Sequence, residues 1–228
     1  MNLDEPYLWN LSVQEAREVQ KNLAHRVRIQ KIPERIKTVA GCDVAYDTDS
    51  QRLTAGMVVL NFPDLTIVDE ITINEPITFP YIPGYLSFRE APAIINLIKQ
   101  YEHSIDLFIF DGHGIAHPRS LGIAAHIGVL LDIPSIGCAK KKLIGTYETP
   151  EEHKGSQTDL IHKGRIIGRV LRSKDSVKPV FVSVGHKVNL DDSVNLILRC
   201  CTKYRLPEPT RLADIAVARA KKFINIQM

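Results

Sequence analysis

An apolar run that leads into an acidic, glycine-rich loop constrains the fold of this chain more than any other stretch. Leu107–Phe110 contains no polar residue, and Asp111, Gly112 and Gly114 follow directly. Such a run predicts a strand buried on both faces, as in α/β sheets. The glycines permit a sharp turn and a close ligand approach, and open α/β sheets place their sites at the carboxyl ends of strands. A simple Asp-Gly turn is the alternative interpretation.

The length and composition predict one domain, spanning residues 1–228, because 228 residues with 44% hydrophobic content can bury one substantial core. The net charge of +3 is compatible with nucleic acid binding but does not indicate it. No apolar run has membrane-spanning length, and residues 1–5 are too acidic for a signal peptide. None of the four cysteines has zinc-site spacing, so we expect reduced thiols in a cytoplasmic protein.

The hydrophobic pattern predicts a first helix, then an antiparallel β-meander. Ser12 and Glu15 have the spacing of a capping box, and apolar residues recur at helical spacing after them. Turn-forming residues separate three expected strands, at 38–46, 53–62 and 66–77. An antiparallel arrangement of these strands follows from the short connections.

Helices and strands alternate in the remaining chain. Helices are expected at 87–100, at 121–131, from 191 to about 204 and from 210 onwards. Strands are expected at 107–110, 134–138, 165–171 and 180–184, with an irregular exposed excursion at 145–164. Asp191-Asp192-Ser193 and Thr210 are the expected caps of the last two helices. His126, inside an apolar helix, is expected to be a hydrogen-bonded core histidine.

A loop with two prolines precedes the helix at 87–100. Pro80 and Pro83 bracket Tyr81 and Ile82 and hold an apolar tip stiffly, while Gly84 frees the exit of the loop. Stiff apolar tips of this kind can wedge between stacked bases. A loop packed under a neighbouring segment explains the composition equally well.

Four acidic residues fall where one fold can bring them together. Asp43 lies inside a strand, Glu90 at a helix start, Asp111 at a strand end and Asp214 in the first turn of the last helix. Each has a structural alternative, such as a helix cap for Glu90 or a helix-dipole carboxylate for Asp214. One shared cation is more economical, and ligands that are all oxygen favour Mg²⁺ or Mn²⁺. Lys140, directly after a strand, can present an ammonium to a phosphate at the same place.

Four stretches of the chain together resemble the endonuclease V family of deoxyinosine-directed nucleases. They are GCDVAY at 41–46, PYIPGYLSFRE at 80–90, DGHGIAHPR at 111–119 and LPEPTRLAD at 206–214. The resemblance extends from about residue 10 to 222. It implies an α/β, ribonuclease H-like fold, in which a central mixed β-sheet of antiparallel meander plus parallel strands is flanked by helices.

The resemblance also implies roles for individual residues. It assigns metal binding and catalysis to Asp43, Glu90, Asp111 and Asp214, and it places Lys140 near the scissile phosphate. Asp214 stands where some relatives have His, which keeps the ligand set all-oxygen. Tyr81 matches the family's strand-separating wedge. The remaining substrate-binding residues, most of them around the flipped base, are Pro80, Ile82, Pro83, Gly84, Leu86, Gly112, His117, Gly122 and Ile123.

The implied reaction is Mg²⁺-dependent hydrolysis of the second phosphodiester bond 3′ of a hypoxanthine, with Mn²⁺ as a substitute cofactor. It leaves 3′-hydroxyl and 5′-phosphate ends. The expected partners are damaged single- or double-stranded DNA and inosine-containing RNA, and we expect a monomer without membrane contact.

Two alternative functions stay open. One is another ribonuclease H-like nuclease, such as a junction resolvase or an RNA-strand hydrolase; the other is a non-enzymatic nucleic-acid-binding module, which convergent acids disfavour because they repel phosphate without a cation.

Overall fold

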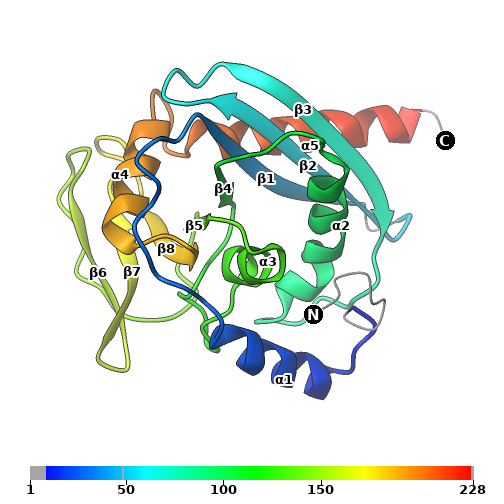
Figure 1. Cartoon of the computed structure of the whole chain (residues 1–228), viewed down its shortest axis with the longest axis horizontal. Coiled ribbons are helices and arrows are strands. Elements are labelled where there is room, and N and C mark those ends of the chain that lie inside the picture. The colour runs from blue at the N-terminus through cyan, green and yellow to red at the C-terminus, as the bar shows by residue number, and fades with distance from the viewer. Residues whose placement is uncertain (1–8, 48, 227–228) are drawn as a thin grey trace.

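One eight-stranded mixed β-sheet forms the centre of the chain (Figure 1). The computed structural model describes residues 9–47 and 49–226, so the acidic residues 1–5 and Thr48 lie outside the described residues. The order of the strands across the sheet is β3-β2-β1-β4-β5-β8-β7-β6. The strands are β1 Thr38–Asp47, β2 Arg52–Asn61, β3 Ile67–Pro76, β4 Leu107–Phe110, β5 Ser135–Ala139, β6 Gln157–His162, β7 Arg165–Leu171 and β8 Val180–His186.

The predicted antiparallel meander is confirmed, because β1 pairs antiparallel with β2 and β2 with β3. The centre of the sheet is parallel, with β4 between β1 and β5. All four residues of β4 are buried, as the apolar run predicts. Phe108 and Phe110 face one core, and Leu107 and Ile109 face the other. This alternation follows from the two-residue period of a strand.

Helices cover both faces of the sheet (Figure 1). The helices are α1 Val13–Ala24, α2 Leu86–Gln100, α3 Ile123–Leu131, α4 Leu190–Cys200 and α5 Glu208–Ile226. Side chains of α2 and α3 share one core with the sheet, whereas side chains of α4 and α5 share the other. None of the described helices combines the length and the apolar character needed to cross a membrane.

The last helix, α5, lies directly against the first two strands. A Cβ atom at Gly41 would lie 2.0 Å from the carbonyl carbon of Pro209, and one at Gly56 would lie 2.5 Å from Cγ1 of Val217. Such distances are far inside van der Waals contact, so only glycine fits at these two positions. The close approach brings Asp214, in the second turn of α5, over β1.

The structure corrects several predicted helix starts. The capping box of Ser12 with Glu15 is confirmed at α1. At α2 the helix begins one residue early, at Leu86, because Ser87 Oγ is hydrogen-bonded to His126 Nδ1 (2.9 Å) instead of capping the helix. The cap of α4 is Asn189, whose side chain accepts from the backbone N–H of Asp192, and α4 ends at Cys200.

Two further predictions are wrong: the start of the last helix, and the absence of regular structure at residues 145–164. The helix α5 begins at Glu208, before the predicted cap Thr210. Thr210 therefore lies inside the helix, where its hydroxyl donates to the Pro207 carbonyl (3.2 Å). The region expected to be irregular contains β6, which pairs antiparallel with β7 across a turn at Lys163 and Gly164. As an edge strand, β6 buries only Leu160, so its sequence carries little apolar signal.

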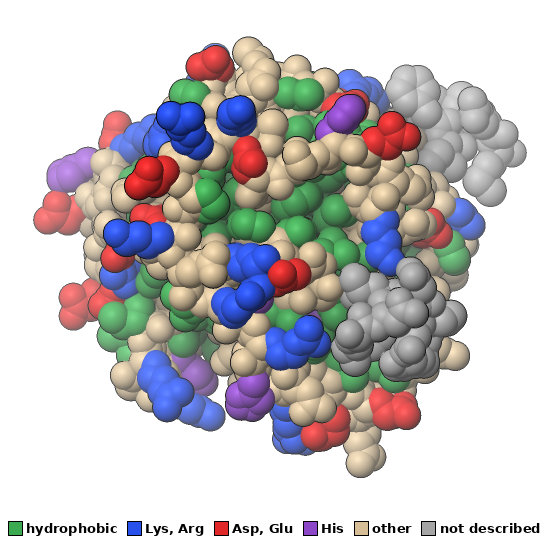
Figure 2. All heavy atoms as spheres, viewed as in Figure 1, with side chains coloured by type: hydrophobic (Ala, Val, Ile, Leu, Met, Phe, Trp, Pro, Cys, Tyr) green, Lys and Arg blue, Asp and Glu red, His purple; other side chains and the backbone are tan. Residues whose placement is uncertain are grey.

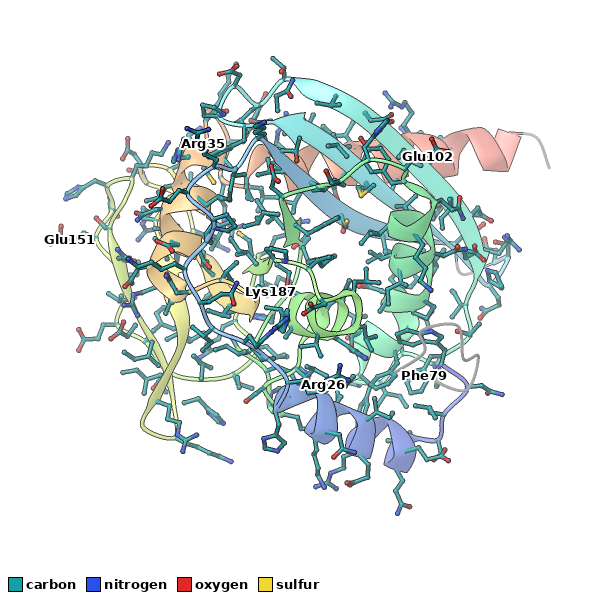
Figure 3. All side chains as sticks on the ribbon, viewed as in Figure 1. Arg26, Arg35, Phe79, Glu102, Glu151 and Lys187 are labelled. Carbon is teal, nitrogen blue, oxygen red and sulfur yellow. The ribbon has the colours of Figure 1, made fainter. Side chains whose placement is uncertain are left out.

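Basic side chains on the face that carries α1 and α3 are interspersed with acidic ones (Figure 2). Lys187, which follows β8, reaches the end of α3 (Figure 3), where its Nζ lies 2.7 Å from Asp132 Oδ2. Arg28 and His186 also contact Asp132, and the Lys187 bond is the largest of several effects that hold the pKa of Asp132 well below its usual range. These three basic groups are therefore partnered by one carboxylate.

His126 makes the stability of the fold depend on pH. The side chain is buried against Phe88 (4.9 Å between ring centroids), and burial lowers its pKa to about 3. Because the unfolded chain binds this proton near pH 6.5, stability should fall as the pH drops from about 6.5 towards 3. We expect His126→Asn to reduce that fall by on the order of 1 kcal/mol per pH unit, measured by urea unfolding at several pH values. An unchanged pH dependence would contradict this assignment.

Candidate active site

The pairing of β1 with β4 places two carboxylates side by side. Cys42 pairs with Phe110, and the Asp111 N–H donates to the Cys42 carbonyl (3.5 Å). The residues that follow this pair, Asp43 in β1 and Asp111 directly after β4, therefore lie next to each other. Two of the four predicted acids are brought together by strand register alone.

Asp214 and Lys140 complete this corner of the site. Asp214 reaches it from α5, and its side chain is one of the groups that raise the pKa of Asp43. Lys140 follows β5, the parallel neighbour of β4, and its Nζ lies 2.5 Å from Asp111 Oδ2 and 3.8 Å from Asp214 Oδ1. The ammonium thus lies between carboxylates that come from the middle and the end of the chain.

Glu90 approaches from α2 and is held by a tyrosine that the sequence analysis did not single out. The Tyr46 hydroxyl donates to Glu90 Oε1 (2.6 Å), and the Arg89 guanidinium lies 4.8 Å from the centre of the Tyr46 ring. Arg89 also donates to the carbonyl of Phe79 (3.1 Å), which lies at the start of the proline loop, next to α2 (Figure 3). Glu90 is therefore not a helix cap.

The electrostatics of the site reflect crowded negative charge. Burial, and after it the charge of Asp111, raises the pKa of Asp43 to about 8. Burial raises the pKa of Glu90 to about 7, although the bond from Tyr46 opposes this shift. Burial also lowers the pKa of Lys140, but its bond to Asp111 and the neighbouring carboxylates outweigh burial and raise it. Added positive charge at this point would favour the ionised carboxylates.

The chemistry of this carboxylate cluster, Asp43, Glu90, Asp111 and Asp214, fits a hard divalent cation. In the part of the chain that the structure describes, no three Asp, Glu, His or Cys side chains form a ready-made metal site, and the Lys140 ammonium lies among the carboxylates instead. All the donors are carboxylate oxygens, which Mg²⁺ and Mn²⁺ prefer. A bound cation would lower the raised pKa values of Asp43 and Glu90 and favour their ionised forms.

A cavity of about 170 Å³, here called the base cavity, lies next to the carboxylate cluster. It gathers nearly all the predicted substrate-binding residues, and Pro80 alone of that set is not among its lining residues. The lining residues are Tyr81, Ile82, Pro83, Gly84, Leu86, Ser87, Gly112, His113, His117, Gly122, Ile123 and Leu143. Larger hollows of about 410 and 590 Å³, beside α4 and β6, contain none of the four carboxylates.

The tip of the proline loop divides into an exposed half and a packed half. Tyr81 is 67% exposed, so its ring is available to another molecule. Ile82 is half-buried against the cluster that contains Phe79, Tyr85 and Phe88. The packed-loop interpretation therefore holds for Ile82, whereas the wedge role of the exposed Tyr81 stays a prediction.

His117 belongs to the support of the base cavity. Its Nδ1 accepts from the backbone N–H of Arg119 (3.2 Å), so its Nε2 carries the proton and donates to the Gly84 carbonyl (3.0 Å). Burial, with Arg119 second, lowers the pKa of His117 to about 4. The ring is consequently neutral at pH 7 and holds the backbone of the proline loop.

Sequence reasoning missed Tyr46, Gln20 and Arg119, which support the site residues. Tyr46 stands only three residues after Asp43, but its partner is on another element. Gln20 is a buried polar residue in line with Ala16 and Leu23 on the packed face of α1. A polar side chain at a core position of an amphipathic helix was the available signal.

Comparison with known proteins settles the family. A family model described as Endonuclease V matches residues 21–215. The chain belongs to the endonuclease V family. It is 48% identical over 215 residues to an endonuclease V of Trichormus variabilis, covering 94% of this chain and 97% of the relative. The solved endonuclease V of Streptomyces avermitilis has a TM-score of 0.91 and 40% identity, over 96% of this chain and 97% of that one.

A third relative was solved with nucleic acid. Ciona intestinalis endonuclease V, in complex with a 23mer DNA containing an inosine followed by a ribo-adenosine, has a TM-score of 0.82 and 28% identity. The match covers 93% of this chain and 98% of that one. Membership of the endonuclease V family confirms the predicted ribonuclease H-like fold and makes the chain an endonuclease. The roles of individual residues stay predictions that rest on the geometry above.

The contact between Tyr46 and Glu90 generates a prediction. Tyr46→Phe removes the hydroxyl that orients the Glu90 carboxylate but keeps the ring under Arg89. A hydrogen bond to a charged group contributes about 1.5–3 kcal/mol, so we expect Mn²⁺ to bind roughly tenfold more weakly, measured by calorimetry. Tyr101→Phe, at the far end of α2, is the matched control and should leave Mn²⁺ binding unchanged. Equal affinities in all three proteins would show that Tyr46 does not orient Glu90.

Proposed function

We propose that the chain is a Mg²⁺-dependent endonuclease that recognises hypoxanthine in DNA and hydrolyses the second phosphodiester bond on its 3′ side. The products carry 3′-hydroxyl and 5′-phosphate ends. One observation supports this most: Asp111 belongs to the carboxylate cluster, and the next residue, Gly112, lines the base cavity. Recognition and hydrolysis would thus share one loop. The inosine in the DNA bound by Ciona endonuclease V supports hypoxanthine as the recognised base.

The base cavity suits a flipped purine that lacks an exocyclic amine at C2. Its walls combine backbone at Gly84, Gly112 and Gly122 with apolar side chains such as Leu86 and Ile123. Guanine differs from hypoxanthine by one amine, which a close-fitting wall can reject by contact and by leaving a buried donor unpaired. Adenine presents a donor where hypoxanthine presents its carbonyl acceptor, so the same backbone groups would discriminate against it.

The carboxylate cluster would hold Mg²⁺, with Mn²⁺ as a substitute, through Asp43, Glu90, Asp111 and Asp214. When bound, such an ion stabilises charge that develops on the phosphate and activates water near neutral pH. Lys140 already points into the cluster and is placed to contribute its ammonium to the phosphate being cut. Tyr46 donates to Glu90, so this proposed ligand keeps a fixed direction.

The exposed ring of Tyr81 would enter the base stack while the base turns into the cavity. Flipping a base out of a duplex costs a few kcal/mol, and an inserted side chain offsets part of this by filling the gap. Pro80 and Pro83 keep the loop stiff, so little ordering entropy is lost on insertion. Single-stranded DNA and inosine-containing RNA fit the same cavity without this step, and both are proposed substrates.

The proposed position of the cut, one phosphate beyond the bond next to the recognised base, follows from the offset between the base cavity and the carboxylate cluster. Successive phosphates lie several ångströms apart, about 3.4 Å of axial rise in a duplex, so a small offset selects a phosphate beyond the lesion. All four carboxylates and the lining of the base cavity come from one chain. A single copy therefore holds the complete site, which supports a monomer as the active unit.

Mapping of the cleaved ends tests the proposal directly. Matched DNA and RNA oligomers, with or without one hypoxanthine, are incubated with Mg²⁺, and we expect cutting only at the second phosphodiester bond 3′ of the hypoxanthine. Asp43→Ala and Asp111→Ala should abolish cutting and retain lesion binding, because they remove proposed metal ligands but leave the cavity. Free hypoxanthine would indicate a glycosylase, cutting without hypoxanthine another nuclease, and binding without cutting a binding module.

The wedge generates a separate prediction. Tyr81→Ala should weaken binding to a hypoxanthine in duplex DNA by about tenfold or more, but weaken binding to the same lesion in a single strand much less. Only the duplex must be unstacked. Ile166→Ala, an exposed apolar truncation on β7, is the control and should affect neither. Equal losses on both substrates, measured by fluorescence anisotropy, would reduce Tyr81 to an ordinary contact.

A further inference from the structure

A fully buried glutamine on α1 joins two sides of the base cavity. Gln20 has 0% of its surface exposed. Its Nε2 donates to the carbonyl of Gly84 (3.0 Å) and makes a longer contact with the carbonyl of Leu121 (3.4 Å). These carbonyls lie 64 and 101 residues further along the chain. One amide group thus connects the proline loop with the segment that begins α3.

The orientation of this amide is determined by Arg119. The Arg119 Nε donates to Gln20 Oε1, which leaves Nε2 facing the two carbonyls. Arg119 also donates to the Gly84 carbonyl (2.6 Å), and its guanidinium lies 4.3 Å from the centre of the Tyr85 ring. Every polar group of the glutamine amide is therefore paired, as a buried amide requires.

The two connected carbonyls belong to two segments that border the base cavity. Gly84 lines one wall, and its positive φ of 80° is a conformation that suits glycine. Leu121 directly precedes Gly122 and Ile123, which line the other wall. His117 and Arg119 also donate to the Gly84 carbonyl, and Gln20 adds a connection from Gly84 to Leu121 through a side chain that itself lies outside the cavity lining.

We propose that Gln20 is a positioning residue for base discrimination, which holds the Gly84 wall and the Gly122–Ile123 wall at the separation that admits hypoxanthine and rejects guanine. The inference rests on the proposed function, because it concerns the base that the cavity accepts. Hydrogen bonds of defined length fix a separation more narrowly than apolar packing, since side chains such as Met repack over several rotamers. A difference of one amine demands such narrow control.

This role predicts a change in the ratio of the cleavage rate at hypoxanthine to the cleavage rate at guanine. Without the glutamine amide the walls can move apart, so hypoxanthine loses contacts while guanine loses its clash. A residue that only stabilised α1 would lower the cleavage of both bases together. The ratio of the two rates therefore separates a positioning role from a structural one.

The experiment compares Gln20→Met and Gln20→Glu with wild type, on single-stranded oligomers that differ only in hypoxanthine or guanine at one position. Single-turnover rates and binding affinities are measured with enzyme in excess. We expect the hypoxanthine-to-guanine ratio to fall about tenfold in Gln20→Met. It should fall further in Gln20→Glu, which turns an acceptor towards two carbonyl oxygens. Ser12→Ala removes the cap of the same helix and should leave the ratio unchanged.

The outcomes distinguish this inference from the function on which it rests. A wild-type chain with no preference for hypoxanthine overturns the proposed function and this inference together. A wild-type preference that persists in both Gln20 variants overturns the inference alone, as does an equal fall in Ser12→Ala. Should Gln20→Glu fail to fold, Gln20→Met decides, because its side chain fills the same space and brings no unpaired polar atom.

Discussion

The side-by-side placement of Asp43 and Asp111 is the constraint on which the rest of this structure depends. Two carboxylates on neighbouring buried strands repel each other, and burial deprives them of water. The register of β1 and β4 nevertheless leaves them no alternative position. Lys140 from β5 offsets part of this charge, and the sheet and two helix layers supply the stability that the site lacks. Destabilised polar sites within an over-determined fold are typical of enzymes.

Around this pair, the residues that would touch substrate are held by further side chains, most of which lie outside the cavity lining. Tyr46 and Arg89 hold Glu90 and the entry of the proline loop, while Gln20, His117 and Arg119 converge on the Gly84 carbonyl. Each support is buried or half-buried and hydrogen-bonded. Rigid support of this kind keeps catalytic and binding groups within tenths of an ångström of their working positions.

The pattern of residues within short stretches of the sequence was sufficient to predict much of the fold. The limits of β4, the antiparallel meander and the capping box of α1 were all predicted correctly, because each depends on neighbours in sequence. The start of α2 was wrong because Ser87 bonds to His126, 39 residues away. Gln20 and Tyr46 escaped notice for the same reason, since their partners lie on other elements. The edge strand β6 carried too little apolar alternation to be recognised.

The packing of α5 on β1 and β2 has a consequence for how the protein is made. Those two strands leave the ribosome early, yet the helix that covers them and contributes Asp214 is synthesised after every strand. A nascent chain therefore exposes the groove over Gly41 and Gly56 and has only three of the four carboxylates. Under the metal-ligand role proposed for Asp214, hydrolytic capacity would arise only when the final helix docks, and an incomplete chain would not cut the nucleic acid around it.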